Sequence, residues 1–247
     1  MMYQDNNIQL YKGDCLEIMK EIPDKSIDMI LCDLPYGTTE CKWDNAIDLE
    51  LLFLQYDRII KDNGVIALFA QQPFGSDLIY SYRKYFRYEI IWEKTKPLGF
   101  FNAKKMPLRS HENILFFYKK LPYYNPKLED CNKTIKRPSN SAVYGTRSSR
   151  NDNYIRTKTG YPRSVMKYSN VFSPQLHSTQ KPVELLQMLI ETYTDENFVV
   201  LDNCMGSGST GVACVSINRK FIGIEKDDNY FEIAKKRIER VKDDVSR

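Results

Sequence analysis

Short runs of hydrophobic residues alternate with stretches of helical spacing along most of the chain. Five runs have few polar breaks and predict buried strands, at residues 8–11, 27–32, 65–70, 198–201 and 221–224. Between and after them, apolar positions recur at helical spacing, over residues 15–21, 47–61, 75–85, 182–193, 210–217 and 228–242. Near-continuous apolar strands separated by helices predict an α/β fold, with a mostly parallel, doubly wound sheet of Rossmann type covered on both faces.

The alternation is interrupted once. Residues 88–92 and 114–118 read as two strands joined by a basic loop, and past residue 120 the regular spacing ends. Residues 121–170 are rich in Pro, Asn, Ser, Lys, Arg and Tyr. We therefore expect one α/β domain, made of residues 1–120 and 171–247, with an irregular insert at 121–170.

The net charge of +4 conceals an uneven distribution. Of the 36 Lys and Arg residues, 17 lie between Lys94 and Asn170 beside four acids, so this segment carries +13 and the remainder −9. Such a basic segment is typical of a surface that binds a polyanion, although a solvated lysine-rich loop has the same composition. The candidate contacts with a polyanion such as DNA are Lys104, Lys105, Arg109, Lys136, Arg137, Arg147, Arg150 and Arg156.

Composition argues against several classes of protein. No apolar stretch is long enough to cross a bilayer, and the polar first residues lack the core of a signal peptide. The six cysteines include no CxxC pair, and only two histidines accompany them, so we expect reduced thiols and no metal site. The cytoplasm is the expected compartment.

A glycine-rich loop follows the predicted strand at 198–201. Gly206-Ser207-Gly208-Ser209-Thr210-Gly211 spells GxGxxG between a strand and a helix, where glycine permits close approach and the helix N-terminus offers N–H donors. Glu225, at the end of the next strand, is placed to bind ribose hydroxyls. A tight packing turn is the alternative. Only 36 residues follow Gly211, too few for a dinucleotide domain, so the pattern favours a nucleoside cofactor such as S-adenosylmethionine.

The turn Asp33-Leu34-Pro35-Tyr36 ends another buried strand, at the sheet edge where α/β proteins bind ligands. Methylation of a base amino group needs acceptors on its N–H bonds, because the nitrogen lone pair is delocalised into the ring. The Asp33 carboxylate and the Leu34 carbonyl supply two acceptors, and Pro35 restricts Leu34 to extended geometry. Tyr36 is suited to stack on an extruded base. An aspartate-capped turn with a buried tyrosine is the structural alternative.

Together these motifs resemble the β-class amino-methyltransferases of DNA, in which a D-P-P-Y motif precedes the target-recognition region and the cofactor loop comes last. The run from Asp33 to Thr39, followed by Lys42-Trp43-Asp44, resembles the phage and prophage branch of that family. The resemblance covers about residues 8–120 and 171–243. It implies that residues 1–120 and 171–247 form a catalytic and cofactor-binding domain and that the insert at 121–170 recognises the target. It implies methyl transfer from S-adenosylmethionine to double-stranded DNA with base flipping, commonly by a protein that pairs as a homodimer.

The resemblance also implies a set of cofactor-binding residues. Gly13-Asp14 resembles the acidic turn near the adenine, and His177-Ser178-Thr179-Gln180-Lys181-Pro182 resembles the segment beside the methionine end. The implied contacts are Asp14, Thr179, Lys181, Asp202, Cys204, Gly206, Gly208 and Glu225. The chain departs from the family pattern where Leu34 replaces the first proline and where Asn203-Cys204 replace Pro-Phe. The second departure bears on the tightness of cofactor binding.

In this family an aspartate that opens the catalytic motif accompanies mainly adenine, and a serine accompanies mainly cytosine N4. We therefore expect N6 of adenine as the target. Methylation of cytosine N4 or of RNA is an alternative with the same chemistry. A nicotinamide oxidoreductase, suggested by the literal GxGxxG, and a DNA-binding protein with an inactive cofactor pocket are alternatives from other classes.

Overall fold

The computed structural model describes residues 2–5, 7–37, 47–135, 154–170 and 180–245. The chain folds into two compact units, the first made of residues 1–125 and 163–247 and the second of residues 126–162. Among the described residues, no helix is both long and apolar enough to span a membrane.

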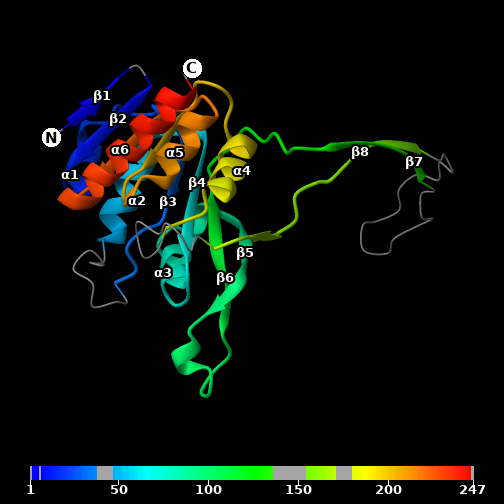
Figure 1. Ribbon diagram of the computed structural model, residues 1–247. Coiled ribbons are helices and arrows are strands. Elements are labelled where there is room, and N and C mark those ends of the chain that lie inside the picture. Colours follow the sequence, from blue (N-terminus) through cyan, green and yellow to red (C-terminus); the bar gives the residue numbers. More distant parts are fainter. Residues whose placement is uncertain (1, 6, 38–46, 136–153, 171–179, 246–247) are drawn as a thin grey trace. The chain divides into compact units, whose positions relative to one another are not determined.

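The first unit is built on a nine-stranded sheet with the strand order β1-β2-β11-β10-β3-β4-β6-β5-β9 (Figure 1). The strands are β1 (Met2–Gln4), β2 (Ile8–Lys12), β3 (Ile27–Cys32), β4 (Ile60–Ala70), β5 (Phe86–Leu98), β6 (Arg109–Phe117), β9 (Val165–Tyr168), β10 (Val199–Asp202) and β11 (Lys220–Glu225). The five central strands, from β2 to β4 in this order, run parallel, and β5 and β9 also pair in parallel. Strand β6 is antiparallel to both of its neighbours. The predicted mostly parallel α/β sheet is confirmed.

Helices cover both faces of this sheet. They are α1 (Cys15–Ile18), α2 (Leu49–Ile59), α3 (Phe74–Ser81), α4 (Val183–Tyr193), α5 (Ser209–Ser216) and α6 (Asp228–Val245). Side chains of α4, α5 and α6 pack into one hydrophobic core, whereas those of α1, α2 and α3 pack into the other. Strand β4 serves both cores in alternation, because Val65, Ala67 and Phe69 face the first and Ile66, Leu68 and Ala70 the second. This two-sided burial explains the continuous apolar runs.

The strand order reverses direction between β10 and β3. After β10 the chain continues through α5 to β11 on one side, whereas after β3 it continues through α2 to β4 on the other. In open α/β sheets, ligands bind at such a switch point, beyond the carboxyl ends of the strands. The register pairs Val200 with Met29 and Leu201 with Ile30, so the segments that follow β10 and β3 leave the sheet side by side.

Some elements differ from the sequence predictions. The helix expected over residues 75–85 ends at Ser81 and is followed by a 3-10 turn at Arg83–Tyr85, because Tyr82 leaves the helical conformation. The Tyr82 ring stacks on Phe53 of α2 with centroids 4.4 Å apart, which fixes this break. The sequence also predicted no strand at β1 or at β9. Strand β9 places residues 165–168, part of the predicted insert, in the main sheet.

The second unit contains a two-stranded antiparallel sheet of β7 (Glu129–Ile135) and β8 (Tyr154–Thr159). Glu129 pairs with Thr159, and the Lys158 ammonium donates to the Asp130 carboxylate at 2.6 Å. No pattern in the sequence indicates these two strands. Four of the predicted DNA contacts, Lys136, Arg137, Arg147 and Arg150, lie outside the described residues.

Asp28 connects three strands at the end of the sheet opposite to the switch point. Its buried carboxylate accepts the Val199 backbone N–H at 2.9 Å and the Lys61 ammonium at 2.6 Å, which links β3 to the start of β10 and to β4. Backbone groups at a strand start lack a ladder partner, so this side chain satisfies a donor that burial would otherwise leave unpaired.

We predict that Asp28→Ala lowers the free energy of unfolding by about 1–3 kcal/mol, because it leaves the Val199 N–H without its acceptor. Urea unfolding measures the change. Asp24→Ala is the control, since Asp24 forms an exposed ion pair with Arg58 and its removal is expected to cost less than about 1 kcal/mol. Equal unfolding midpoints for the two variants would contradict this role of Asp28.

Candidate active site

The predicted catalytic turn, Asp33 to Tyr36, directly follows β3 at the switch point. The Tyr36 hydroxyl donates to Asp33 Oδ1 at 2.9 Å, and the Tyr36 ring packs on Phe74 of α3 with centroids 5.1 Å apart. The Leu34 side chain is buried in the core beneath α1, α2 and α3. Burial, reinforced by the Asp33 charge, raises the pKa of Tyr36 well above its ordinary value, so its hydroxyl stays a donor. These contacts fix carboxylate and ring beside each other.

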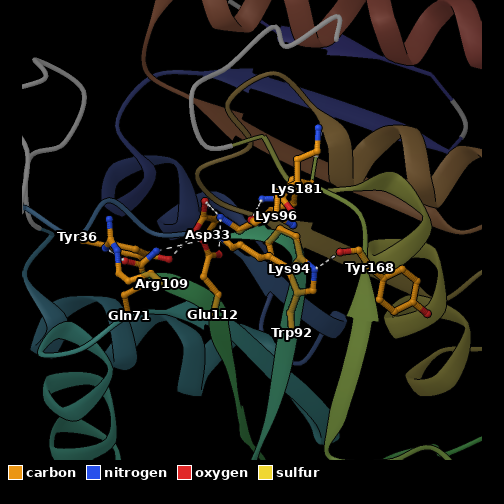
Figure 2. Close-up of polar contacts among 11 residues, drawn as sticks. Asp33, Tyr36, Gln71, Trp92, Lys94, Lys96, Arg109, Glu112, Tyr168 and Lys181 are labelled. Carbon is orange, nitrogen blue, oxygen red and sulfur yellow. Dashed lines mark hydrogen bonds and ion pairs between the residues drawn. The ribbon is translucent and has the colours of Figure 1, made fainter. Parts of the chain in front are cut away.

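Lys181 donates to Oδ2, the second carboxylate oxygen of Asp33. Its ammonium lies 2.5 Å from Asp33 Oδ2 and 3.3 Å from Glu112 Oε2 (Figure 2). It also lies over the Phe69 ring. Burial alone would lower the pKa of Lys181, but the charges of Asp33 and Glu112 outweigh it and raise this pKa. The sequence predicted Lys181 as a contact of the cofactor. In the structure its ammonium lies against the predicted catalytic turn, and the cofactor contact stays a prediction.

Glu112 and its neighbours form a polar group that the sequence analysis missed. Glu112, on β6, accepts hydrogen bonds at Oε1 from Lys94 of β5 and from Gln71, which follows β4 (Figure 2). Arg109, one of the predicted DNA contacts, donates to Gln71 Oε1 and is thus connected to Glu112 through Gln71. The available signal is an acid just before the apolar run that begins at Ile114, because a charge that becomes buried requires a partner.

The glycine loop follows β10, the strand beside β3. Glu225 at the end of β11 accepts the Gly206 N–H at 2.8 Å through Oε2 and the Asp227 N–H at 2.8 Å through Oε1. Gly206 and Gly208 adopt positive φ angles of 52° and 78°. A Cβ on Gly208 would lie 2.8 Å from that of Ala234, so α6 packs too closely for any larger residue. The loop is thus held both by Glu225 and by packing.

Two further acids belong to this edge of the sheet, since Asp202 ends β10 directly before the loop and Asp14 follows β2, on the far side of β11. The Asp202 carboxylate accepts the Cys204 N–H at 3.1 Å, and burial raises its pKa to about 6. Asp14 caps α1 by accepting the Leu16 N–H at 3.0 Å, and it also pairs with Lys226 at 3.1 Å. The Gly13 N–H donates to the Glu225 carbonyl at 2.9 Å, which joins the end of β2 to the end of β11. The four acids Asp14, Asp33, Asp202 and Glu225 therefore follow or end adjacent parallel strands.

The structure gives a reason for the unusual Asn203-Cys204 pair. Asn203 is buried, and its Oδ1 accepts the Tyr56 hydroxyl of α2 at 2.6 Å. The Cys204 thiol is within hydrogen-bonding contact of Cys15 and Cys32. Asn203 thereby ties the cofactor loop to the helix that follows the catalytic turn, a connection that a proline cannot form.

Several predicted residues lie elsewhere or are not described. Thr179 lies outside the described residues, as do Lys42 and Trp43. Lys104 and Lys105 are exposed near the tip of the β5–β6 hairpin, which extends beyond the sheet in Figure 1. Arg156 is exposed on β8, in the second unit.

Comparison with known proteins shows which family the chain belongs to. A family model described as DNA methylase, of the N6/N4 methyltransferase type, matches residues 27–236. The chain is similar to the type II methyltransferase M.HinfI of Haemophilus influenzae, with 27% identity over 94% of this chain and 68% of that protein. It is also similar to M2.MboI of Moraxella bovis, with 26% identity over 96% of this chain and 89% of that protein.

The similar solved structures are also DNA methyltransferases. The M1.HpyAVI–SAM complex matches 93% of this chain and 99% of its own, with 27% identity and a TM-score of 0.64. The cytosine-N4-specific PvuII DNA methyltransferase matches 99% of this chain and 93% of its own at 17% identity, with a TM-score of 0.68, and so supports the fold alone. Because the family model spans most of the chain, including the catalytic turn and the glycine loop, the protein belongs to the N6/N4 family of DNA methylases.

Proposed function

We propose that this DNA amino-methyltransferase transfers the methyl group of S-adenosylmethionine to N6 of adenine in a short specific sequence of double-stranded DNA, after the base has turned out of the duplex. One observation carries the proposal. The turn that bears Asp33 and Tyr36 and the loop that bears Gly206 follow β3 and β10, which are paired, parallel strands at the switch point of the sheet. Cofactor and target base thus have sites at one edge.

The residues at this edge offer an acceptor or a donor to each polar part of the cofactor. Glu225 is the half-buried last residue of β11, where its carboxylate suits the ribose hydroxyls, and Asp14 follows the neighbouring strand β2, near the expected adenine. Asp202, together with the loop that follows it, is assigned to the methionine end. The ionised Asp202 carboxylate attracts the ammonium of the methionine moiety, whereas the N–H donors of the loop suit its carboxylate.

Asp33 and Tyr36 are assigned to the target base. A base that stacks on the Tyr36 ring gains about 1–3 kcal/mol, which offsets part of the cost of leaving the duplex. Since Tyr36 donates to Asp33 Oδ1, ring and carboxylate keep a fixed relation, and the amino group of the stacked base meets an acceptor. Asp33 then localises the nitrogen lone pair and balances the positive charge that grows as the methyl group arrives.

Adenine is preferred to cytosine because the catalytic turn opens with Asp33, and in this family an aspartate at that position accompanies mainly adenine, whereas a serine accompanies mainly cytosine N4. The Asp33 carboxylate is a strong acceptor for an amino group of either base, so the chemistry alone does not choose between them. The product identifies the base. We predict that DNA incubated with methyl-labelled S-adenosylmethionine yields labelled N6-methyladenine after digestion to nucleosides.

In the same assay, Asp33→Ala should abolish labelling while binding the cofactor with nearly unchanged affinity. The control is Asp77→Ala, which removes an exposed aspartate of α3 and should label DNA normally. Label in N4-methylcytosine would overturn the choice of adenine. If no DNA becomes labelled, whether or not RNA does, the proposed function itself is wrong.

Cofactor binding should depend on the ionisation of Asp202. Burial raises the pKa of this group to about 6, so its carboxylate is charged above that pH and becomes neutral as the pH falls through it. We predict that affinity for S-adenosylmethionine, measured by calorimetry from about pH 5 to about pH 7.5, decreases towards the acid end.

Asp202→Asn is the comparison for this titration. Its affinity should be lower at neutral pH and should depend less on pH, with only the Glu225 contribution left, since burial raises the pKa of Glu225 as well. The same pH dependence in both proteins would exclude Asp202 as the ammonium partner.

The β5–β6 hairpin supplies a surface for the DNA backbone. Lys104 and Lys105 lie near its tip together with the fully exposed ring of Phe101. Lysine side chains that contact phosphates release counterions, which makes affinity fall steeply with salt. We therefore assign both lysines to phosphate contacts that hold the duplex beside the site.

We predict that Lys104→Gln with Lys105→Gln weakens DNA binding to all sequences alike. The slope of log affinity against log salt should become shallower by about 2, since each lost phosphate contact removes about 0.9. Fluorescence anisotropy over a salt series measures this slope. Lys20→Gln, in the acidic remainder of the chain, should leave the slope unchanged, and an unchanged slope in the double variant would refute the assignment.

A further inference from the structure

Four side chains of alternating charge lie in a row behind the catalytic turn. Asp33 contacts Lys181, Lys181 contacts Glu112, and Glu112 contacts Lys94 (Figure 2). They come from four separate parts of the fold, namely the end of β3, the segment before α4, β6 and β5. The side chains of Lys181, Glu112 and Lys94 are each less than a tenth exposed, and that of Asp33 is 20% exposed. The row therefore leads from the interior to the proposed base site.

Burial of this many charges is costly, and apolar residues of similar size often stabilise a core better. A buried ionic row is therefore a candidate for function rather than for stability. Each charge in the row has a neighbour of opposite sign, so the row as a whole is compensated. The two oxygens of Glu112 differ in the hydrogen bonds that they accept, and this difference indicates the role of the row.

Glu112 Oε1 is fully engaged, whereas Oε2 is not. Oε1 accepts hydrogen bonds from Lys94 and from Gln71, the latter at 3.1 Å. Oε2 is buried, and among the described residues no donor satisfies it with hydrogen-bond geometry. The Lys181 ammonium lies 3.3 Å away, about 0.5 Å beyond the usual length of a charged N–H···O bond. Lys94 and Gln71 thus hold Glu112 in place with one acceptor in reserve.

Asp33, in contrast, is crowded. Its Oδ1 accepts the Tyr36 hydroxyl and its Oδ2 accepts Lys181. A target amino group needs an acceptor on the same carboxylate, and its nitrogen becomes positive as the methyl group arrives. An ammonium bound tightly to Asp33 would compete for that oxygen and repel the developing charge.

We propose that Glu112 is a positioning residue of the methyl transfer, which takes the Lys181 ammonium from Asp33 when the target amino group binds there. The inference rests on the proposed function, because it assumes that Asp33 receives an amino group. Lys181 then neutralises Asp33 while the site is empty and pairs with Glu112 while it is occupied. The movement is short, so the ammonium stays over the Phe69 ring, and no charge is left without a partner at either position.

The test compares single-turnover methyl transfer at saturating cofactor and DNA. We expect Glu112→Gln, which keeps the shape but removes the charge that attracts Lys181, to lower the rate at least about tenfold. Affinity for S-adenosylmethionine should stay within about twofold, because Glu112 does not contact the cofactor in this account. Glu93→Gln is the matched control, since Glu93 is a half-exposed carboxylate on β5 that pairs with Lys167. Its rate should equal that of the wild type.

A second substitution distinguishes positioning from a purely structural role. If Lys181 blocks Asp33 once Glu112 has lost its charge, then adding Lys181→Met to Glu112→Gln should raise the rate several-fold above that of the single variant. Methionine has a similar length and packs well on the Phe69 ring. Glu112→Asp, which keeps the charge for Lys94 but withdraws the carboxylate by one methylene, should also lower the rate and serves if Glu112→Gln does not fold.

Three results would overturn the inference. They are a rate for Glu112→Gln within about twofold of the wild type, a double variant no faster than the single one, and a loss of cofactor affinity as large as the loss of rate. Failure of the proposed function looks different, because the wild-type protein would then transfer no methyl group to adenine in DNA.

Discussion

The pairing of β3 with β10 determines where the proposed chemistry takes place. These strands lie far apart in the chain, yet Met29 pairs with Val200 and Ile30 with Leu201 in parallel. Parallel strands end at the same edge, so this register brings the turn of Asp33 beside the loop of Gly206. The crossover after β3 goes to one side and that after β10 to the other, which opens the edge between them. A methyl donor and a methyl acceptor can meet only in such a shared space.

Charge compensation at this edge is the second constraint. Acids end or follow β2, β3, β10 and β11, and each one is engaged in the structure: Asp14 by Lys226, Asp33 by Lys181, Asp202 by a backbone N–H and Glu225 by two. In the proposed function, substrate and cofactor replace or share these partners. Backbone donors at Asp202 and Glu225 hold the loop in shape, while the ammonium of a lysine, carried on a flexible stem, is suited to leave Asp33. The nature of each partner thus matches the ligand that the carboxylate is assigned to receive.

The sequence predicted the central sheet and the two motifs because both depend on local patterns. Strands buried on both faces appear as apolar runs, and a glycine at positive φ before a helix, as at Gly208, is visible in a single segment. The pair of Asn203 with Tyr56 and the pair of Glu112 with Lys181 were not predictable, since each joins residues far apart in the chain. Strand β9 was missed for a related reason. Its residues are half-buried or exposed at the sheet edge, and it pairs with β5 through the backbone, helped by the Trp92 indole N–H on the Tyr168 carbonyl.

A crystal structure of the protein with a non-reactive analogue of S-adenosylmethionine tests the central claim most directly. The account predicts an analogue in the space between the ends of β10 and β3, with its ribose hydroxyls on Glu225, its methionine end at the loop of Asp202 and Gly206, and its methyl-bearing position directed to Asp33. An analogue bound away from the glycine loop, or one whose reactive end is directed away from Asp33, would contradict it.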